Sequence, residues 1–245
     1  MPERRVALVT GGSRGIGRAI CLQLARDYAL ALNYNTSVEE AKATLSDIEN
    51  RGGEGIVVQG DVRDRAAVDE MFDKTEEALG PVAVLVNNAG IRRDALAVRI
   101  SDEDWDDVLA TNLTGAFTCA RRGLRSMIRQ RFGRIVNVTS VAGVRGSAGQ
   151  ANYCAAKTGL IGLTRSLARE VARKNITVNA VAPGLVETEL TTSLGSDRYA
   201  ELVREIPMGR AATPEEIAAA VSFLCSDAAT YVTGAVLMAD GAMTA

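Results

Sequence analysis

Seven short apolar segments, each long enough for one β-strand, alternate along the chain with segments of helical length. The apolar segments are residues 5–10, 29–34, 55–60, 82–87, 134–139, 176–181 and 235–239. Continuous apolar runs of this length are typical of strands buried on both faces, and an intervening helix allows consecutive strands to run parallel. The alternation therefore predicts an α/β fold in which a seven-stranded parallel sheet is doubly wound, with helices on both faces.

The chain is predicted to form one domain over residues 1–245, because no repeat, low-complexity tract or flexible linker interrupts the pattern. Helix starts are indicated by Asp64, by Ser101 with Asp104, and by Thr213 with Glu216. Residues 184–212 form the least regular stretch, and they follow a predicted strand. We expect this stretch to be an active-site lid, the alternative being a surface excursion without a role.

Composition excludes several classes of protein. The 28 Lys and Arg residues nearly balance 30 Asp and Glu residues, so the net charge of −2 gives no reason to expect binding to nucleic acid or to an acidic membrane. No apolar run approaches the roughly 18 residues that a membrane-spanning helix needs. The 47% of hydrophobic residues include few aromatics, as expected for strands packed beneath helices.

The chain has no histidine, which excludes imidazole metal ligands and Ser-His-Asp hydrolysis. We expect no metal site, and any proton transfer must use Tyr, Lys, Cys, Asp or Glu. The cysteines show no paired spacing and are expected to be reduced thiols in a cytoplasmic protein, or in an organelle matrix if a targeting peptide precedes this sequence. They are Cys21, Cys119, Cys154 and Cys225.

A glycine-rich stretch, TGGSRGIG at residues 10–17, follows the first apolar segment and precedes a helical one. Gly11, Gly15 and Gly17 would permit a tight turn and close approach of a pyrophosphate to the N-terminus of the helix. This context predicts a dinucleotide site, the alternative being an ordinary glycine-rich turn.

The end of the second predicted strand favours NADP(H) over NAD(H). NAD sites usually place a carboxylate there to accept hydrogen bonds from the ribose, but residues 33–37 read NYNTS, with no acid before Glu39. Arg14 lies in the glycine turn, where its guanidinium could hold a 2′-phosphate. The alternative is that Arg14 is only a solvated loop cation.

Candidate chemical groups follow the fourth and fifth strands and occupy the helix after them. Asn88 and Ser140 should emerge at the carboxyl edge of the sheet, where open α/β folds bind ligands. Tyr153 and Lys157 would share one helix face, and we expect the lysine cation to lower the pKa of the phenol. Ser140 could donate a hydrogen bond to a substrate carbonyl oxygen as negative charge develops there.

The motifs TGGSRGIG, NNAG (87–90), TNLTG (111–115), YCAAK (153–157) and PG (183–184) occur in this order. With them the chain resembles the short-chain dehydrogenase/reductases, which have a Rossmann fold. Among these it is most similar to the β-ketoacyl-acyl carrier protein reductases, through GIRRD (90–94), GQANYCAAKTGLIG (149–162) and REVARKNITVNAVAPGLVET (169–188).

The resemblance implies a catalytic tetrad of Asn112, Ser140, Tyr153 and Lys157. Ser140 would polarise the carbonyl, Tyr153 donate the proton, Lys157 hold the nicotinamide ribose, and Asn112 complete a proton relay. The implied cofactor contacts are Gly11, Ser13, Arg14, Gly15, Ile16, Gly17, Thr36, Asp61, Val62, Asn88, Tyr153, Lys157 and Val186.

The resemblance also implies partners. One face of the predicted helix 152–172 would pair with a second subunit of a homotetramer, while its leucines pack on the parent sheet. Arg131 and Lys174 match basic residues that receive the acyl carrier protein near the active-site mouth, although the basic run 121–134 also fits a solvated helix face. Ala242 stands where the family commonly has glycine.

The function implied is NADPH-dependent reduction of 3-oxoacyl-acyl carrier protein to the 3-hydroxyacyl form in fatty-acid biosynthesis. Two alternatives remain open at this stage. One is an acetoacetyl-CoA reductase or another short-chain carbonyl reductase, which would share the catalytic residues. The other is a non-catalytic NADP-binding scaffold that kept the fold without turnover.

Overall fold

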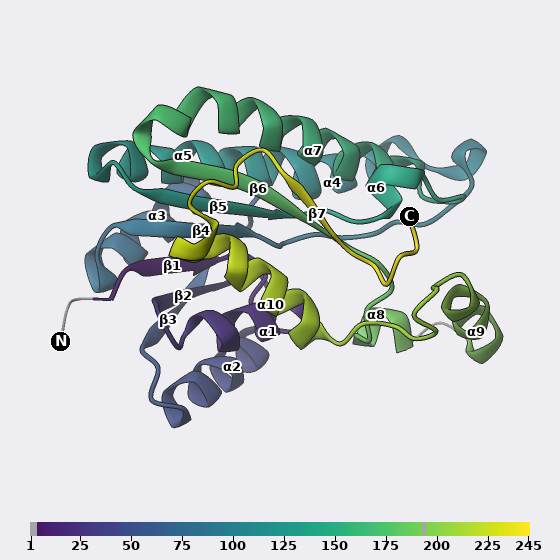
Figure 1. Cartoon of the computed structure of the whole chain (residues 1–245), viewed down its shortest axis with the longest axis horizontal. Coiled ribbons are helices and arrows are strands. Elements are labelled where there is room, and N and C mark those ends of the chain that lie inside the picture. The colour runs from purple at the N-terminus through teal and green to yellow at the C-terminus, as the bar shows by residue number, and fades with distance from the viewer. Residues whose placement is uncertain (1–3, 193–194) are drawn as a thin grey trace.

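The computed structural model describes residues 4–192 and 195–245. Its centre is one seven-stranded sheet in which all pairings are parallel and the strand order is β3-β2-β1-β4-β5-β6-β7 (Figure 1). The strands are β1 (Val6–Val9), β2 (Ala29–Tyr34), β3 (Gly55–Gln59), β4 (Val82–Asn87), β5 (Gly133–Val138), β6 (Ile176–Pro183) and β7 (Val236–Ala239). The predicted sheet is confirmed.

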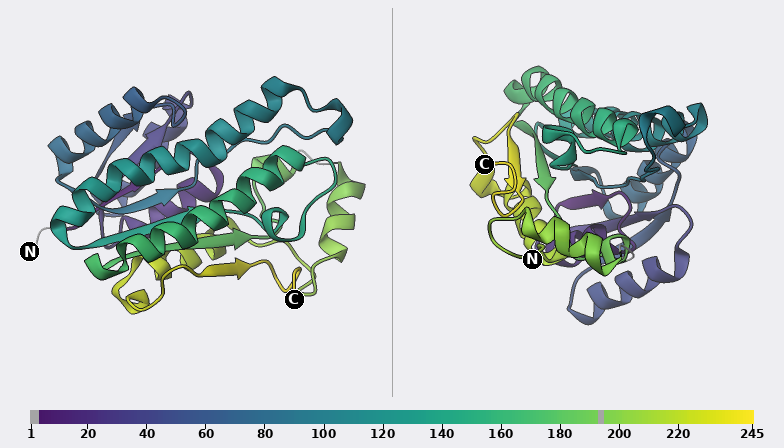
Figure 2. Two further views of the ribbon diagram at one scale, coloured as in Figure 1. Left: turned by 90° about the horizontal axis from the view of Figure 1, so that it is seen from above. Right: turned by 90° about the vertical axis from the view of Figure 1, so that its right-hand side faces the viewer.

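Helices cover both faces of the sheet (Figure 2). Alternate side chains of β1 divide between two cores: Ala7 and Val9 pack with α1 and α10, whereas Val6 and Leu8 pack with α3, α5 and α7. The α-helices are α1 (Gly15–Leu24), α2 (Val38–Asn50), α3 (Arg65–Leu79), α4 (Asp102–Leu109), α5 (Gly115–Gln130), α6 (Ala142–Arg145), α7 (Ala151–Val171), α8 (Glu189–Thr192), α9 (Ser196–Arg204) and α10 (Pro214–Cys225).

Shorter helical turns complete the connections. They are η1 (Ala97–Arg99), η3 (Ala172–Lys174) and η4 (Asp227–Ala229), together with a π-helical turn, η2 (Ala110–Thr114), between α4 and α5. Among the residues described, no helix combines the length and apolar character needed to cross a membrane.

The predicted helix starts are present. Asp64 accepts a hydrogen bond from the Ala66 amide, and Ser101 accepts one from the Asp104 amide. Thr213 and Glu216 form a complete capping box at the start of α10. These short polar side chains satisfy amides that the helix itself leaves without partners.

Polar side chains join α7 to the buried strands. Asn87 donates to the side chain of Asn137, which donates to the Thr164 hydroxyl on α7, both at 2.8 Å. Nearer the carboxyl edge, the Thr139 hydroxyl donates to the backbone carbonyl of Lys157 at 2.8 Å. Buried hydrogen bonds of this kind fix the position of α7 along β5 as well as its distance from the sheet.

The predicted lid leaves the sheet after β6 and contains α8 and α9; its residues 193 and 194 lie outside the described part. Its two ends meet in a parallel bridge between Val186 and Ala212. The Glu187 amide donates to the Ala212 carbonyl, and the Ala212 amide donates to the Leu185 carbonyl, each at 2.9 Å. Both helices lie beyond the carboxyl ends of the strands, at the right of Figure 1.

Candidate active site

The glycine turn between β1 and α1 has the conformation that its sequence predicts. Gly11 and Gly15 have positive φ angles of 63° and 53°. A Cβ on Gly17 would lie 2.1 Å from the Gly11 carbonyl oxygen, so a side chain there cannot be accommodated without a backbone shift. Asn88 closes the turn, since its Nδ2 donates to the carbonyls of Thr10 and Gly11 at 3.0 Å.

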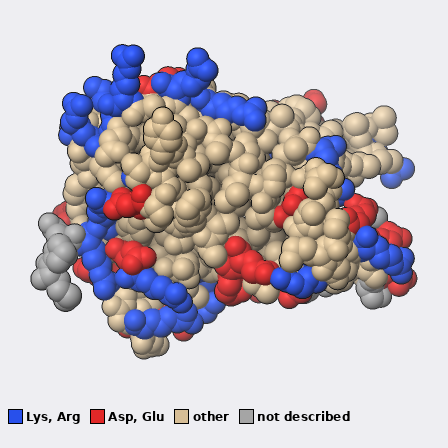
Figure 3. All heavy atoms as spheres, in the orientation of Figure 1, with Lys and Arg blue, Asp and Glu red and all other residues tan. Residues whose placement is uncertain are grey.

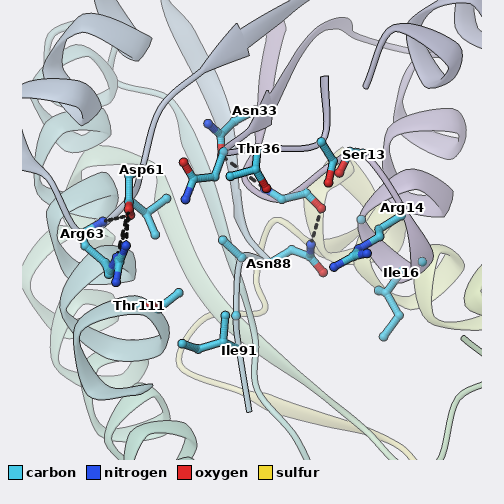
Figure 4. Close-up of a pocket in the computed structure, with 18 of the residues that line it drawn as sticks. Ser13, Arg14, Ile16, Asn33, Thr36, Asp61, Arg63, Asn88, Ile91 and Thr111 are labelled. Atoms are coloured by element: carbon cyan, nitrogen blue, oxygen red, sulfur yellow. Dashed lines mark hydrogen bonds and ion pairs between the residues drawn. The ribbon is translucent and has the colours of Figure 1, made fainter. Parts of the chain in front are cut away.

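This turn opens onto a cleft of about 680 Å³ at the carboxyl edge of the sheet (Figure 4). Ten of the predicted cofactor residues line it: Gly11, Ser13, Arg14, Gly15, Ile16, Gly17, Thr36, Asp61, Val62 and Asn88. The first turn of α1 begins here without a side-chain cap, which leaves backbone N–H groups for an anion. The cleft therefore fits a dinucleotide whose pyrophosphate lies at the glycine turn.

Tyr153, Lys157 and Val186 are the predicted cofactor residues that the cleft lining does not include. The first two lie on α7, whereas Val186 follows β6. Its side chain is buried, and its backbone pairs with Ala212 at the base of the 184–212 segment. Two residues further on, Thr188 lines the cleft and lies against the glycine turn, 3.6 Å from where a Cβ of Gly15 would stand.

No acidic side chain stands where β2 meets the cleft. Asn35, Thr36 and Ser37 line this part of the wall, and Arg14 lines the same cleft. The Arg14 guanidinium lies 3.7 Å from the Glu189 carboxylate of α8, and both side chains are mostly exposed, so the pair is weak and open to exchange with another anion.

Arg63 is a second cation that lines the cleft, and the sequence analysis did not identify it. It contacts Asp61 at 2.7 Å and Asp107 at 2.9 Å, and its hydrogen bond to Asp61 lowers the pKa of that carboxyl group. Figure 4 shows this pair across the cleft from Ser13 and Arg14. Its position after β3, at the carboxyl edge, is the signal that could have identified it.

Asn112 and Lys157 lie together beside the cleft. A Cβ on Gly90, which lines the cleft, would stand 3.1 Å from Asn112 Oδ1 and 3.5 Å from Lys157 Nζ. Asn112 lies in the π-helical turn η2, a distortion often found at functional sites. Its amide accepts from the Ile91 N–H at 2.8 Å and donates to the Ile91 carbonyl at 2.9 Å, which fixes its orientation.

Lys157 is buried, and its Nζ donates to the Val138 carbonyl at 2.8 Å. Burial lowers the pKa of its ammonium group to about 8. Its Nζ lies 5.6 Å from the centre of the Tyr153 ring. The lysine is thus one turn from the phenol, as predicted, but it is not a permanent cation.

Tyr153 and Ser140 face each other across the α7–β5 contact. Burial raises the pKa of Tyr153, and a side-chain hydrogen bond with Ser140 opposes that rise. The expected lowering of this pKa was wrong for the protein without ligands, because removal from water outweighs the favourable contacts of the phenolate. Ser140 also accepts from the Ala142 amide at 3.2 Å, so it caps a turn as well.

Arg131 and Lys174 occupy the opposite edge of the sheet from this cluster. Arg131 ends α5 just before β5, and Lys174 lies in η3 just before β6, whereas Ser140 follows β5. One strand of this length separates the two edges by about 20 Å. Figure 3 shows cationic side chains gathered over this end of the molecule, at its upper left. Within one subunit the two residues therefore do not lie at the active-site mouth, and their role in docking the carrier stays a prediction.

The leucines predicted on helix 152–172 pack on the parent sheet. Leu160, Leu167 and Val171 are buried inside the subunit. On α7 the exposed Ala and Gly residues are Ala151, Ala155 and Gly162, while Gly159 lies against Leu113.

Comparison with known proteins agrees with this architecture. The sequence profile described as short chain dehydrogenase matches residues 5–199. Two curated relatives are the 3-oxoacyl-acyl-carrier-protein reductases FabG of Staphylococcus aureus and Escherichia coli. The first is 45% identical over 244 residues, covering 99% of both chains, and the second is 46% identical over 241 residues, covering 98% of both chains.

Replacing the buried lysine should stabilise the fold. Its pKa falls from the ordinary 10.5 to about 8, so below pH 8 the folded protein carries a buried charge that the unfolded chain keeps in water. We expect Lys157→Met to raise the free energy of unfolding by about 1–3 kcal/mol at pH 7. Because the unfolded lysine keeps its proton up to about pH 10.4, the gain should shrink as the pH rises from 8 to 10.

Denaturant unfolding at pH 7, 8.5 and 10 measures this effect, with the exposed Lys174→Met as the matched control. A loss of stability in Lys157→Met at pH 7 would mean that the hydrogen bond to Val138 outweighs the cost of burying the charge.

Proposed function

The chain belongs to the short-chain dehydrogenase family, and from that premise we propose that it reduces 3-oxoacyl groups on acyl carrier protein in fatty-acid biosynthesis. The protein is an oxidoreductase that uses a nicotinamide cofactor; we propose that the cofactor is NADPH. The strongest support is that two reductases of this activity are 45% and 46% identical to this chain over nearly its full length. The chain also places Asn112 and Lys157 beside the cleft.

The glycine turn, the α1 N-terminus and Asn88 would hold the dinucleotide, with Asp61 and Val62 at the far wall and Thr36 and Arg14 near the adenosine ribose. When bound, NADPH supplies the hydride that reduces the carbonyl carbon. Arg14 would pair with the 2′-phosphate, which no carboxylate at the end of β2 opposes.

The remaining chemistry is performed by the chain itself. Ser140 donates a hydrogen bond to the ketone oxygen and stabilises the charge that develops there. Tyr153 donates its proton to that oxygen, giving the hydroxyl. Lys157 would hold the ribose next to the nicotinamide, and Asn112 would help to position water through which a proton returns toward Lys157.

Residues 184–212 act as the lid of this site. Thr188 and Glu189 already line the cleft, and the bridge between Val186 and Ala212 anchors both ends of the segment next to it. A segment held in this way can close over a substrate and exclude water while its base stays fixed.

We expect Tyr153→Phe to lower kcat by about 10²–10⁴, the range for a lost general acid. The assay is oxidation of NADPH with acetoacetyl-acyl carrier protein and, in parallel, acetoacetyl-CoA. Circular dichroism serves as the control and should match the wild type, because only the hydroxyl is removed.

Preference for the carrier-linked substrate supports the proposed activity, and equal or better use of the CoA ester favours the acetoacetyl-CoA reductase. If the protein turns over no ketoacyl thioester, the alternative of a non-catalytic NADP-binding scaffold is favoured. A fully active Phe variant removes Tyr153 from the reaction.

Cofactor choice is tested at two positions of the cleft wall. Arg14→Ala removes the cation, and Thr36→Asp places a carboxylate where NAD enzymes have one. Each should lower kcat/KM for NADPH about 10–100-fold, with a much smaller change for NADH. Arg14→Ala loses a charge-assisted hydrogen bond, whereas Thr36→Asp places a carboxylate that repels the 2′-phosphate. Arg26→Ala, an exposed arginine at the end of α1, is the control. Equal efficiency with both cofactors in the wild type would contradict the role of Arg14.

Arg131 and Lys174 lie at the opposite edge of the sheet from their own cleft. We propose that they serve the cleft of a neighbouring subunit in a homotetramer. Exposed apolar side chains on α4 and α5, Trp105 and Phe117, supply contact surface for such an assembly. The free thiols of all four cysteines suit a reducing compartment, and we place the protein in the cytoplasm.

Charge reversal tests this docking surface. The double variant Arg131→Glu, Lys174→Glu should raise KM for the acidic carrier-linked substrate at least about tenfold at low salt and leave KM for the CoA ester unchanged. Light scattering reports whether the tetramer persists, and Arg26→Glu is the matched control. Equal kinetics of wild type and variant with the carrier substrate would exclude these residues from docking.

A further inference from the structure

The loop after β4 is hydrogen-bonded to the π-helical turn η2 at its start and to the residues before α7 at its end. At its start, both backbone groups of Ile91 bond the side chain of Asn112. At its end, Asp94 accepts from Gln150 Nε2 at 3.0 Å, and the Ala95 amide donates to the Gly149 carbonyl at 2.9 Å. Residues 91–95 are therefore held against the segment that leads into α7.

The first turn of α7, which carries Tyr153, is also hydrogen-bonded to this loop. Asn152 Nδ2 donates to the Arg93 carbonyl at 3.1 Å, while its Oδ1 accepts from the Tyr153 amide at 2.8 Å. One amide side chain thus joins the loop backbone to the backbone of Tyr153. Arg92 and Asp94, on either side of Arg93, are held at a set distance from the phenol.

The Arg92 guanidinium makes a long ion pair and, within the described part of the chain, lacks a hydrogen bond from its Nε. Its Nε is buried and has no hydrogen-bond partner among the described residues. Its ion-pair contact is with Asp94, whose Oδ2 lies 3.9 Å from this Nε, beyond hydrogen-bond distance. Only 26% of the Arg92 side chain is exposed, so water screens the guanidinium incompletely.

Among the described residues, the titratable groups that act on the phenol or lie beside its ring include Arg92 and Asp94 from the loop, and Cys154 and Lys157 from α7. Arg92 favours the phenolate, whereas Asp94 and Cys154 oppose it, and all three act on the pKa of Tyr153. Lys157 directs its Nζ to the Val138 carbonyl, and its own pKa of about 8 makes its charge variable above neutrality. Among these groups Arg92 carries the guanidinium, the side chain that proteins do not deprotonate.

We propose that Arg92 is a positioning residue for proton transfer: held by loop 91–95, it supplies the fixed positive potential under which Tyr153 gives up its proton, and Asp94 moderates that potential. This inference rests on the proposed role of Tyr153 as proton donor. It assigns to this chain a second cation for the reaction, independent of the protonation state of Lys157.

The direct test follows Tyr153 by carbon-13 NMR with tyrosine labelled at Cζ, in protein without cofactor. The chain has five tyrosines, and the resonance absent from Tyr153→Phe identifies the one of interest. Asp94→Asn should lower the midpoint of its titration by about 0.5–1 pH unit, and Arg92→Gln should raise it by a similar amount. The double variant should return toward the wild type.

Two controls separate charge from structure. Arg92→Lys keeps the cation and should retain most of the wild-type midpoint. Arg93→Gln removes a neighbouring exposed cation that pairs with Asp104, and it should leave the midpoint in place. If Arg92→Gln does not fold, Asp94→Asn and Arg92→Lys still decide the matter.

The kinetic readout is the pH profile of kcat for ketone reduction. Because the reaction needs the protonated phenol, the alkaline limb should move to higher pH in Arg92→Gln and to lower pH in Asp94→Asn. A uniform drop in kcat with an unmoved limb and an unmoved NMR midpoint would overturn the inference. A fully active Tyr153→Phe would instead overturn the proposed function, whatever the NMR midpoints show.

Discussion

The site depends on how α7 is fixed to the end of β5. The hydroxyl of Thr139 holds the backbone of Lys157, and the ammonium group of the same lysine holds the carbonyl of Val138. A Cβ on Gly143 would lie 2.8 Å from Lys157, so only glycine lets the turn after β5 approach this closely. Tyr153 lies on α7 and Ser140 follows β5, and these contacts bring the two side chains together.

This attachment has an electrostatic cost, since it removes an ammonium group and a phenol from water together. Burial acts on the two in opposite directions, lowering the pKa of Lys157 and raising that of Tyr153, so it shifts both groups toward their neutral forms before any ligand binds. A bound dinucleotide, with its own charges, and the guanidinium of Arg92 then shift that balance. The neutral phenol is the form that a reductase needs at the start of its reaction.

Sequence patterns gave the strands, the helix caps and the glycine turn, because each depends on neighbours a few residues away. Whole strands such as β4 are buried on both faces and read as unbroken apolar runs. The pKa of Tyr153 could not be foreseen, since it depends on burial by segments far apart in the chain. Motif matching did not show at which edge of the sheet Arg131 and Lys174 lie, although their positions just before strands indicate it.

The contact between Val186 and Ala212 separates the architecture of the sheet from the shape of the substrate entrance. With the two ends joined to each other, the residues between them form a closed loop whose length does not affect the spacing of β6 and α10. Evolution can therefore exchange this insert for another and alter which acyl chains are accepted, while the nucleotide-binding half of the molecule keeps its geometry.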